Sequence, residues 1–290
     1  MKIILLGSTG FLGSILSNTL KSQGYSIFTI GRSKNNDFIS DFKEPVSEEL
    51  PECDILINTV GSTDVDLCQR DLKYAMDGNI NPCLYIRNIF ELYSRKEYLK
   101  PYFINISSDQ VYKSAGPHDE SKANPMNNYG ITKLVGENIL DYQYGCSLRT
   151  NFFGFSHSTN KPNFAEWVVS ELSKENQINL FSDVIFNPLY VQTLCDYIVT
   201  LLYKQPKGIF NLGCRDYISK HDFGKVLARE LALDESLIVR CQIKNVMETK
   251  QLAPRPNDMS MDCKKFEREL GYKLPLIGEE ILKFIKIYKS

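Results

Sequence analysis

A tyrosine and a lysine stand four positions apart in the segment Tyr129-Gly130-Ile131-Thr132-Lys133. Residues at this spacing share one face of an α-helix, so the phenol and the ammonium can point in the same direction. A free phenol has a pKa of about 10, and a nearby cation stabilises the phenolate and lowers that pKa. The pair therefore predicts proton transfer, with Tyr129 as the acid and Lys133 as the group that lowers its pKa.

The same spacing recurs at Tyr203 and Lys207, so a second feature must distinguish the two pairs. The later pair spans Pro206 and has no helix after it, whereas an apolar run that ends in two serines precedes Tyr129. In parallel sheets, ligands bind outside the carboxyl ends of the strands. Ser108, the second of those serines, is therefore predicted to donate a hydrogen bond to a substrate carbonyl beside Tyr129.

Three glycines at positions 7, 10 and 13 form a GxxGxxG pattern between an expected strand, Lys2 to Leu6, and an expected helix, Leu12 to Gln23. A glycine turn in this position lets the backbone approach a pyrophosphate, and the following helix offers free N–H groups with a partial positive charge. The placement between strand and helix gives the pattern its meaning. It predicts dinucleotide binding.

The end of the second strand indicates which dinucleotide is bound. NAD-binding folds carry an acidic residue there, which accepts a hydrogen bond from the ribose 2′-hydroxyl. This chain has Arg32 and Lys34 instead, and both side chains can pair with a 2′-phosphate. We therefore expect NADP(H) to be preferred, with NAD(H) as the alternative; a solvated basic loop would have the same sequence.

The elements that position these residues alternate between short apolar runs and helical stretches, which is typical of βαβ units and a parallel sheet. The apolar runs are continuous, as expected for strands that helices cover on both faces. We expect strands at Lys2 to Leu6, Ser26 to Ile30, Cys53 to Val60, Tyr102 to Ser107, Cys146 to Thr150, Ile178 to Phe181 and Gly208 to Leu212. We expect helices at Leu12 to Gln23, Asn79 to Leu92, Asn128 to Asp141, Phe164 to Lys174 and Gln192 to Tyr203.

The expected fold class is α/β, a Rossmann-type doubly wound parallel sheet with a smaller, mainly C-terminal lobe for the substrate. The cofactor domain is assigned to residues 1–150 plus about 179–214, because the regular alternation of elements loosens after Asn151. The substrate lobe is assigned to the remaining parts, about 151–178 plus 215–290.

Composition excludes several other classes of protein. The 290 residues are 43% hydrophobic and 24% charged, and the net charge of −1 gives no broad positive field for nucleic acid. The apolar start before Gly7 is too short for a secretory signal or a membrane span, so we expect a cytoplasmic protein without a membrane partner. The eight cysteines form no CxxC pair, which favours reduced, packed thiols and no metal site.

Together these motifs resemble the extended short-chain dehydrogenase/reductases and, within them, the dTDP-4-dehydrorhamnose reductase group. The resemblance rests on the glycine turn, on Tyr129 and Lys133 followed by Gly136-Glu137, and on several further pieces. These are Ser107-Ser108-Asp109-Gln110-Val111-Tyr112, Asn58-Thr59-Val60-Gly61, Asp64-Val65-Asp66, Asn79, Leu148-Arg149-Thr150 and Ala253-Pro254-Arg255-Pro256.

The resemblance implies a role for each matching position. Ser108, Tyr129 and Lys133 would be catalytic, and NADPH would deliver hydride to C4 of a nucleotide-linked 4-keto-6-deoxy sugar, in deoxysugar and polysaccharide biosynthesis. Asn79 would contribute to cofactor binding indirectly, and a homodimer is implied. The cofactor-binding positions would be Gly7, Ser8, Thr9, Gly10, Phe11, Leu12, Gly13, Arg32, Val60, Gly61, Asn79, Tyr129 and Lys133.

Departures from the group concern the substrate. A tryptophan usually follows the Arg-Thr pair in these reductases, whereas this chain has Asn151 and Phe152, which we assign with Ser108 to the sugar pocket. Arg255 could clamp the substrate diphosphate, because a guanidinium matches phosphate geometry, or it could be an ordinary surface arginine.

Two other functions remain open from the sequence. Related dehydratases carry Thr-Asp-Glu where this chain has Ser108-Asp109-Gln110, and Gln110 cannot act as a base, so dehydration is disfavoured. An NAD(P)-dependent nucleotide-sugar epimerase would use the same three catalytic residues. A non-catalytic, nucleotide-binding regulatory subunit would keep the fold but would not need the phenol of Tyr129.

Overall fold

The structure is a computed structural model that describes residues 1–46, 49–113, 115–156, 162–250 and 252–289. It contains two compact units, which are treated separately below. The first unit consists of Met1–Ser108, Asn127–Arg149 and Cys195–Phe210, and the second of Asp109–Met126, Thr150–Leu194 and Asn211–Ser290.

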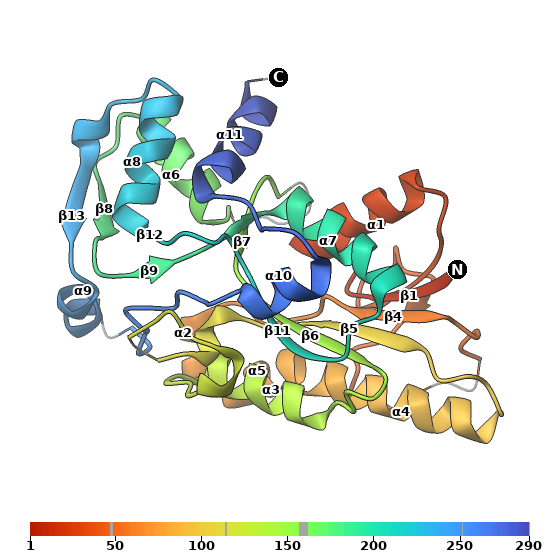
Figure 1. The fold of residues 1–290 in the computed structure, drawn as a ribbon. Coiled ribbons are helices and arrows are strands. Elements are labelled where there is room, and N and C mark those ends of the chain that lie inside the picture. The colour runs from red at the N-terminus through yellow and green to blue at the C-terminus, as the bar shows by residue number, and fades with distance from the viewer. Residues whose placement is uncertain (47–48, 114, 157–161, 251, 290) are drawn as a thin grey trace. The chain divides into compact units, whose positions relative to one another are not determined.

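A parallel sheet of seven strands is the centre of the first unit, in the order β11-β6-β5-β4-β1-β2-β3 (Figure 1). The order reverses between β1 and β4, which gives the doubly wound, Rossmann-type arrangement expected from the sequence. The strands are β1 (Lys2–Leu6), β2 (Ser26–Gly31), β3 (Phe38–Ile39), β4 (Ile55–Asn58), β5 (Tyr102–Ile106), β6 (Gly145–Thr150) and β11 (Gly208–Leu212).

The central strands form where the sequence has continuous apolar runs. All of β4 and β5 is buried, and so is β1 after Lys2. In register, Ile3 of β1 lies between Ile27 of β2 and Ile55 of β4. Burial on both faces explains why these runs do not alternate with polar residues.

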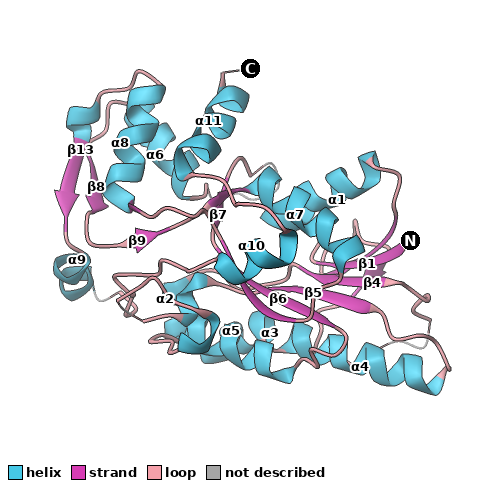
Figure 2. Cartoon of the chain, in the orientation of Figure 1, coloured by secondary structure: helices cyan, strands magenta, loops and turns pink. Residues whose placement is uncertain are grey.

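Helices cover both faces of this sheet (Figures 1 and 2): α1 and α7 lie on one side, and α3, α4 and α5 lie on the other. Aspartate or asparagine side chains cap the N-termini of three of these helices, where each accepts a hydrogen bond from a backbone N–H of the first turn. The helices are α1 (Phe11–Ser22), α2 (Val65–Arg70), α3 (Leu72–Asn79), α4 (Asn81–Arg95), α5 (Asn128–Ile139) and α7 (Val191–Lys204).

The helix expected around Asn79 to Leu92 corresponds to α4, which runs from Asn81 to Arg95, and a separate helix, α3, precedes it. Helix α3 begins after Asp71, whose carboxylate accepts from the backbone N–H of Tyr74 at 2.9 Å, and it ends at Asn79. Helix α4 then begins with a proline in its first turn, at Pro82. A proline lacks the N–H that would continue the preceding helix but fits a first turn, so the chain restarts there.

The core of the first unit lies between the sheet and α4. Leu56 and Phe103 of the sheet pack against Ile86, Ile89 and Phe90 of α4, all of them buried. The eight cysteines of the chain are free thiols, and all except Cys241 are buried. This confirms the expectation of unpaired, packed thiols.

The second unit is built from short elements, with three two-stranded sheets, β10-β7, β12-β9 and β13-β8. Its strands are β7 (Phe152–Phe153), β8 (Ile178–Phe181), β9 (Ile185–Phe186), β10 (Leu189–Tyr190), β12 (Ile218–Ser219) and β13 (Ile238–Cys241). Its helices are η1 (Asp109–Val111), η2 (Glu120–Lys122), α6 (Phe164–Ser173), α8 (Lys220–Glu230), η3 (Glu235–Leu237), α9 (Ile243–Lys250), α10 (Lys264–Leu270) and α11 (Ile277–Tyr288).

Among the described residues, the structure has no helix with the length and apolar character that crossing a membrane requires.

Candidate active site

The glycine turn connects β1 to α1 as predicted. Gly7 has a φ of +84°, and a Cβ there would lie 2.9 Å from Cγ2 of Val60. A Cβ on Gly13, in the first turn of α1, would lie 2.0 Å from the carbonyl oxygen of Gly7. Only glycine allows the turn and the helix to approach each other this closely.

The N-terminus of α1 can accept an anion. Gly10 is its N-cap and provides no side-chain hydrogen bond, and no acidic residue lies in the first turn. The backbone N–H groups at the start of a helix carry a partial positive charge and suit a phosphate group. The glycine cradle and this helix start fit the pyrophosphate of a dinucleotide.

Basic side chains follow β2 where an NAD-binding fold would present a carboxylate. Arg32 and Lys34 are exposed, and neither side chain forms a hydrogen bond or an ion pair with the described residues. The nearest following acid, Asp37, is already engaged, because its carboxylate accepts from the backbone N–H and the hydroxyl of Thr29 at 2.8 Å each. The two hydrogen bonds from Thr29 lower the pKa of Asp37.

Asn36 joins this loop to the glycine turn, a role that no sequence motif predicts. Its Oδ1 accepts from the hydroxyl of Ser8 at 2.6 Å, and its Nδ2 donates to the carbonyl of Ser33 at 2.9 Å. Asn36 is buried beside Gly31, where a Cβ would lie 3.0 Å from its amide nitrogen. It therefore fixes the position of Ser8, one of the predicted cofactor contacts.

Tyr129 and Lys133 occupy successive turns at the start of α5. Asn127 caps this helix, since its Oδ1 accepts from the backbone N–H of Gly130 at 2.8 Å. Ser108 lies two residues beyond the end of β5, and all three predicted catalytic side chains are buried. Buried hydroxyl and ammonium groups are costly unless they have hydrogen-bond partners, and Lys133 has one in the carbonyl of Ile106.

The ammonium of Lys133 connects α5 to the end of β5. Its Nζ donates a hydrogen bond to the carbonyl oxygen of Ile106 at 2.6 Å, two residues before Ser108. Burial lowers the pKa of Lys133, and the neighbouring Cys83 and Glu137 oppose that shift. A Cβ on Gly61 would lie 3.7 Å from this ammonium, so the absence of a side chain at Gly61 leaves space beside it.

Asn79 holds the loop after β4 against α5. Its Oδ1 accepts from the backbone N–H of Ser62 at 3.0 Å, and its Nδ2 donates to the hydroxyl of Thr132 at 3.0 Å. Through these bonds it positions the loop that carries Val60 and Gly61. The indirect contribution of Asn79 to cofactor binding stays a prediction.

A buried ion pair between Glu137 and Arg149 also connects α5 to the sheet. Glu137, one turn after Lys133, accepts from Nη2 of Arg149 at 2.6 Å and from the hydroxyl of Ser107. Glu137 and Arg149 are both buried, so the two charges compensate each other inside the protein. The pair fastens the carboxyl ends of β5 and β6 to α5.

The spacing of Ile131, Leu134, Val135 and Ile139, which lie around the helix from Tyr129 and Lys133, predicts that these apolar residues pack while the pair faces a cleft; the structure differs. The buried face carries Tyr129, Thr132, Lys133, Gly136 and Glu137. Ile131 and Val135 are instead 42% and 39% exposed. Gly136 allows α5 to approach α3 closely, and the hydrogen bonds described above satisfy the buried polar groups, which is why the polar face turns inward.

The predicted substrate residues Asn151, Phe152 and Arg255 all belong to the second unit, whereas Ser108 belongs to the first. Asn151 donates from Nδ2 to the carboxylate of Asp109 at 2.6 Å. Phe152 is half-buried in β7, paired with Leu189 of β10. Arg255 is half-buried and lies close enough to Lys220 to influence its charge.

Residues 1–290 match the family described as the RmlD substrate binding domain. The chain belongs to this family. A curated relative, the probable low-salt glycan biosynthesis reductase Agl14 of Haloferax volcanii, is 26% identical over 97% of this chain and 96% of its own length. The dTDP-4-dehydrorhamnose reductase of Salmonella typhimurium is 25% identical over 95% of this chain and 94% of its own.

The fold is also that of a solved structure, the dTDP-4-dehydrorhamnose reductase of Bacillus anthracis in complex with NADP. The TM-score is 0.80 at 20% identity, and the match covers 100% of this chain and 99% of that one. The family predicted from the motifs and the predicted fold class are thus confirmed.

Membership of the RmlD family does not by itself identify two residues that the structure adds to the predicted set. Asn36 and Lys220 stand in segments without a motif, and Lys220 is one of 34 basic residues in the chain. Their significance follows from contacts made in the folded chain, so the sequence held no signal that would have singled them out.

Proposed function

We propose that this protein is an NADPH-dependent reductase that reduces the 4-keto group of a nucleotide-linked 4-keto-6-deoxy sugar. The observation that carries the proposal is the hydrogen bond from Lys133 to the carbonyl of Ile106. It fixes a buried cation on the same helix as Tyr129 and close in the chain to Ser108. The named reductases among the relatives support the reaction type.

The three side chains divide the chemistry between them. NADPH, when bound, supplies the hydride to the carbonyl carbon. The hydroxyl of Ser108 donates a hydrogen bond to the carbonyl oxygen, and the phenol of Tyr129 transfers its proton to that oxygen as negative charge develops. The cation of Lys133 stabilises the resulting phenolate, which then takes a proton from solvent.

The cofactor preference follows from the loop after β2. A 2′-phosphate adds negative charge and acceptor oxygens, which Arg32 and Lys34 can bind because no described residue uses their side chains. The glycine turn and the start of α1 would hold the pyrophosphate. The first unit thus binds the cofactor. Asn151, Phe152 and Arg255 of the second unit bind the sugar nucleotide.

The reaction can be tested directly. The purified protein is incubated with NADPH and a panel of nucleotide-linked 4-keto-6-deoxy sugars, and the absorbance of the reduced cofactor is followed. We expect consumption of NADPH with at least one sugar and a 4-hydroxy product. Absence of consumption with every sugar would refute the reductase, and interconversion of C4 epimers without net consumption would identify an epimerase.

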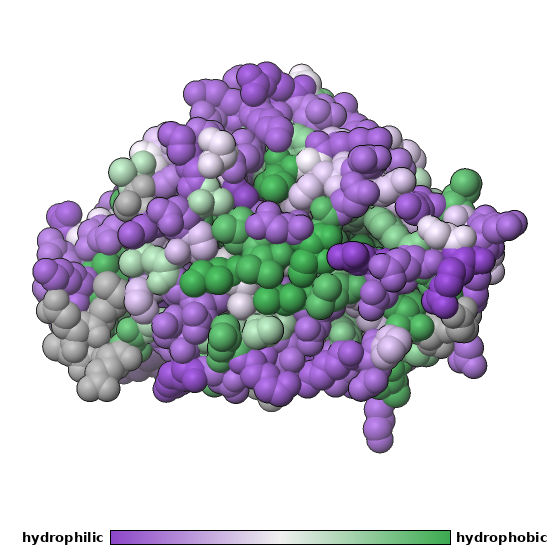
Figure 3. Space-filling model, turned by 90° about the horizontal axis from the view of Figure 1, so that it is seen from below, coloured by the Kyte–Doolittle hydropathy of each residue, from purple (hydrophilic) through white to green (hydrophobic). Residues whose placement is uncertain are grey.

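We further propose that the protein is a homodimer that pairs through the outer face of α3, α4 and α5. Figure 3, seen from the side of these helices, shows hydrophobic residues gathered in the middle of that face. Exposed apolar side chains on these helices include Leu72, Met76, Leu84, Ile131 and Val135. Contiguous apolar surface of this kind is uncommon on monomers.

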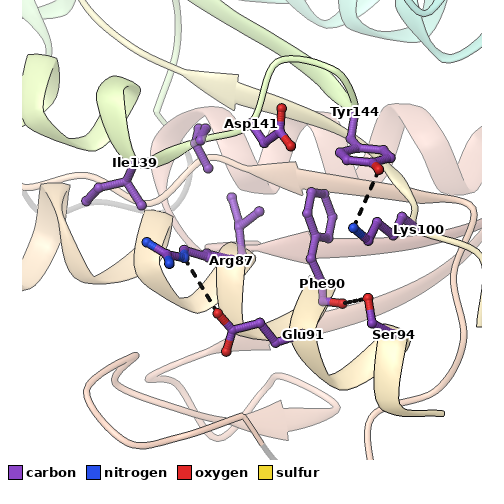
Figure 4. A pocket seen from close by; sticks show the side chains of 10 residues that line it. Arg87, Phe90, Glu91, Ser94, Lys100, Ile139, Asp141 and Tyr144 are labelled. Carbon is purple, nitrogen blue, oxygen red and sulfur yellow. Dashed lines mark hydrogen bonds and ion pairs between the residues drawn. The ribbon is translucent and has the colours of Figure 1, made fainter. Parts of the chain in front are cut away.

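A second copy is the occupant that the charges favour. Helix α4 borders a groove of about 350 Å³, and there Arg87 pairs with Glu91 along its exposed edge (Figure 4). When two such helices pack antiparallel about a two-fold axis, the arginine of each copy lies opposite the glutamate of the other, so the surface is complementary to itself.

Light scattering tests the dimer and should give twice the mass of one chain. Val135→Glu should yield monomers, whereas Ile39→Glu, at an exposed position on β3, should not; a monomeric wild type would exclude the dimer.

A further inference from the structure

Lys220 is held in a defined position in the second unit. It is the first residue of α8, and its backbone N–H donates to the carbonyl of Val184 at 3.0 Å. The preceding residue, Ser219, caps the helix and pairs with Ile185 of β9. The backbone of Lys220 is therefore anchored on both sides, which limits where its side chain can reach.

Two aromatic rings fix the ammonium of Lys220. Its Nζ lies 4.3 Å from the ring centroid of Phe164 on α6 and 5.0 Å from that of Phe186 on β9. Helices α6 and α8 lie side by side, so the contact with Phe164 is made across their interface (Figure 1). A cation over aromatic faces is attracted by them but donates no conventional hydrogen bond to them.

The donors of this ammonium are unused by the protein. Lys220 Nζ makes no hydrogen bond or ion pair with any residue that the structure describes, although an ammonium has three donors. The side chain as a whole is half-buried, and its unused donors are groups that the acceptor oxygens of a ligand would bind.

Two charged side chains among the described residues act on Lys220. The carboxylate of Asp109 favours its protonation, and the guanidinium of Arg255 opposes it. The Asp109 carboxylate also accepts from Asn151 at 2.6 Å, so part of its acceptor capacity is already used. Burial, the largest effect, and the charge of Arg255 lower the pKa of Lys220 to about 8. Two cations against one carboxylate favour an anionic ligand.

We propose that Lys220 is a substrate-binding residue that, together with Arg255, binds phosphate oxygens of the sugar nucleotide. The proposal rests on the function proposed above, which supplies a substrate with a diphosphate group. A guanidinium binds phosphate through paired N–H groups, and an ammonium acts as a compact point charge beside it. The aromatic rings hold the ammonium in place before the ligand arrives, which reduces the loss of side-chain freedom on binding.

Calorimetry of ligand binding to the full chain tests this assignment. The three phosphate-containing probes are inorganic pyrophosphate, dTDP and UDP, and thymidine is the control that lacks phosphate. We expect Lys220→Met to weaken pyrophosphate binding and the binding of the preferred nucleotide about 10- to 100-fold, and Lys220→Arg to weaken them less. Thymidine should bind wild type and variants alike. Lys264→Met removes a lysine from an exposed position of the same unit and should leave all affinities unchanged.

The variants separate the Lys220 proposal from the proposed function. Equal affinity of wild type and Lys220→Met for dTDP and UDP would overturn the assignment, and so would a wild type that binds none of the phosphate probes. NADPH affinity, followed by fluorescence, should be the same in wild type and Lys220→Met, which shows that the variant is folded. If Lys220→Met loses phosphate affinity but the wild type reduces no keto sugar, the anion-binding site is supported and the reductase function is refuted.

Discussion

The ammonium of Lys133 donates a hydrogen bond to the backbone carbonyl of Ile106 across 2.6 Å. This bond ties the helix that carries Tyr129 to the strand end that leads into Ser108. A backbone acceptor cannot be removed by a change of side chain, so the position of the cation depends on the sheet itself. The fold itself therefore determines where the ammonium of Lys133 lies relative to the proposed site of proton transfer.

The phenol of Tyr129 should be essential for turnover. Tyr129→Phe removes the proton donor without changing the shape of the ring, and we expect kcat to fall about 100- to 10,000-fold. NADPH affinity, measured by fluorescence, should change little. Tyr203→Phe is the matched control: Tyr203 is followed by Lys207 at the same spacing but is 69% exposed and hydrogen-bonded to Tyr25. Equal activity of both variants would contradict the assigned role.

The buried pair of Glu137 and Arg149 should matter for stability. Glu137→Gln leaves the buried guanidinium without a compensating charge, and we expect the free energy of unfolding to fall by about 3–5 kcal/mol. The comparison is Glu235→Gln, which breaks the exposed pair with Arg229 and should cost less than about 1 kcal/mol. Urea unfolding measures both variants. Similar losses in the two would mean that the buried pair does not fasten α5 to the sheet.

The glycine turn should not tolerate a side chain at Gly13. A Cβ there would lie 2.0 Å from the carbonyl oxygen of Gly7, so Gly13→Ala must displace α1 from β1. We expect a loss of about 1–3 kcal/mol in thermal or urea unfolding, together with weaker NADPH binding. Gly278→Ala on α11 meets no atom within 4 Å and should leave stability unchanged or raise it by up to about 1 kcal/mol.

Arg32 should discriminate between the two cofactors. Arg32→Ala removes a cation expected at the 2′-phosphate, and we expect the KM for NADPH to rise about tenfold because the residue is exposed. The KM for NADH should not change. Lys73→Ala, at an exposed position of α3, controls for the loss of one positive charge. A wild type that prefers NADH would exclude this role.

The pH dependence of nucleotide binding should reflect Lys220. Its pKa is lowered to about 8 by burial and by Arg255, against the opposing effect of Asp109. The ammonium carries its charge below that pKa and loses it as the pH rises, so affinity for dTDP or UDP should fall between about pH 7 and 9. Lys220→Arg keeps its charge throughout this range and should show a flatter profile. A wild-type profile as flat as that of Lys220→Arg would contradict the role of the ammonium.

The sequence allowed much of the first unit to be predicted, because its signals are local. The strand at Lys2–Leu6 and that at Gly208–Leu212 have the bounds expected from their apolar runs. The apolar pattern predicts α4 but not α3, because the cap at Asp71 and the proline at Pro82, which mark two separate helix starts, are not part of that pattern. The buried face of α5 was assigned to the wrong residues, because hydrophobic pattern alone does not reveal that a polar face has partners.

The sequence by itself determined the α/β class, the turn at Gly7 and the candidate residues Ser108, Tyr129 and Lys133. Each of these follows from the order and spacing of residues along the chain. Only the tertiary structure decided what surrounds them. The bond from Lys133 to Ile106 uses a backbone carbonyl, which no residue pattern reports. The rings around Lys220 come from α6 and β9, distant in sequence, and a contact between distant segments exists only once the chain has folded.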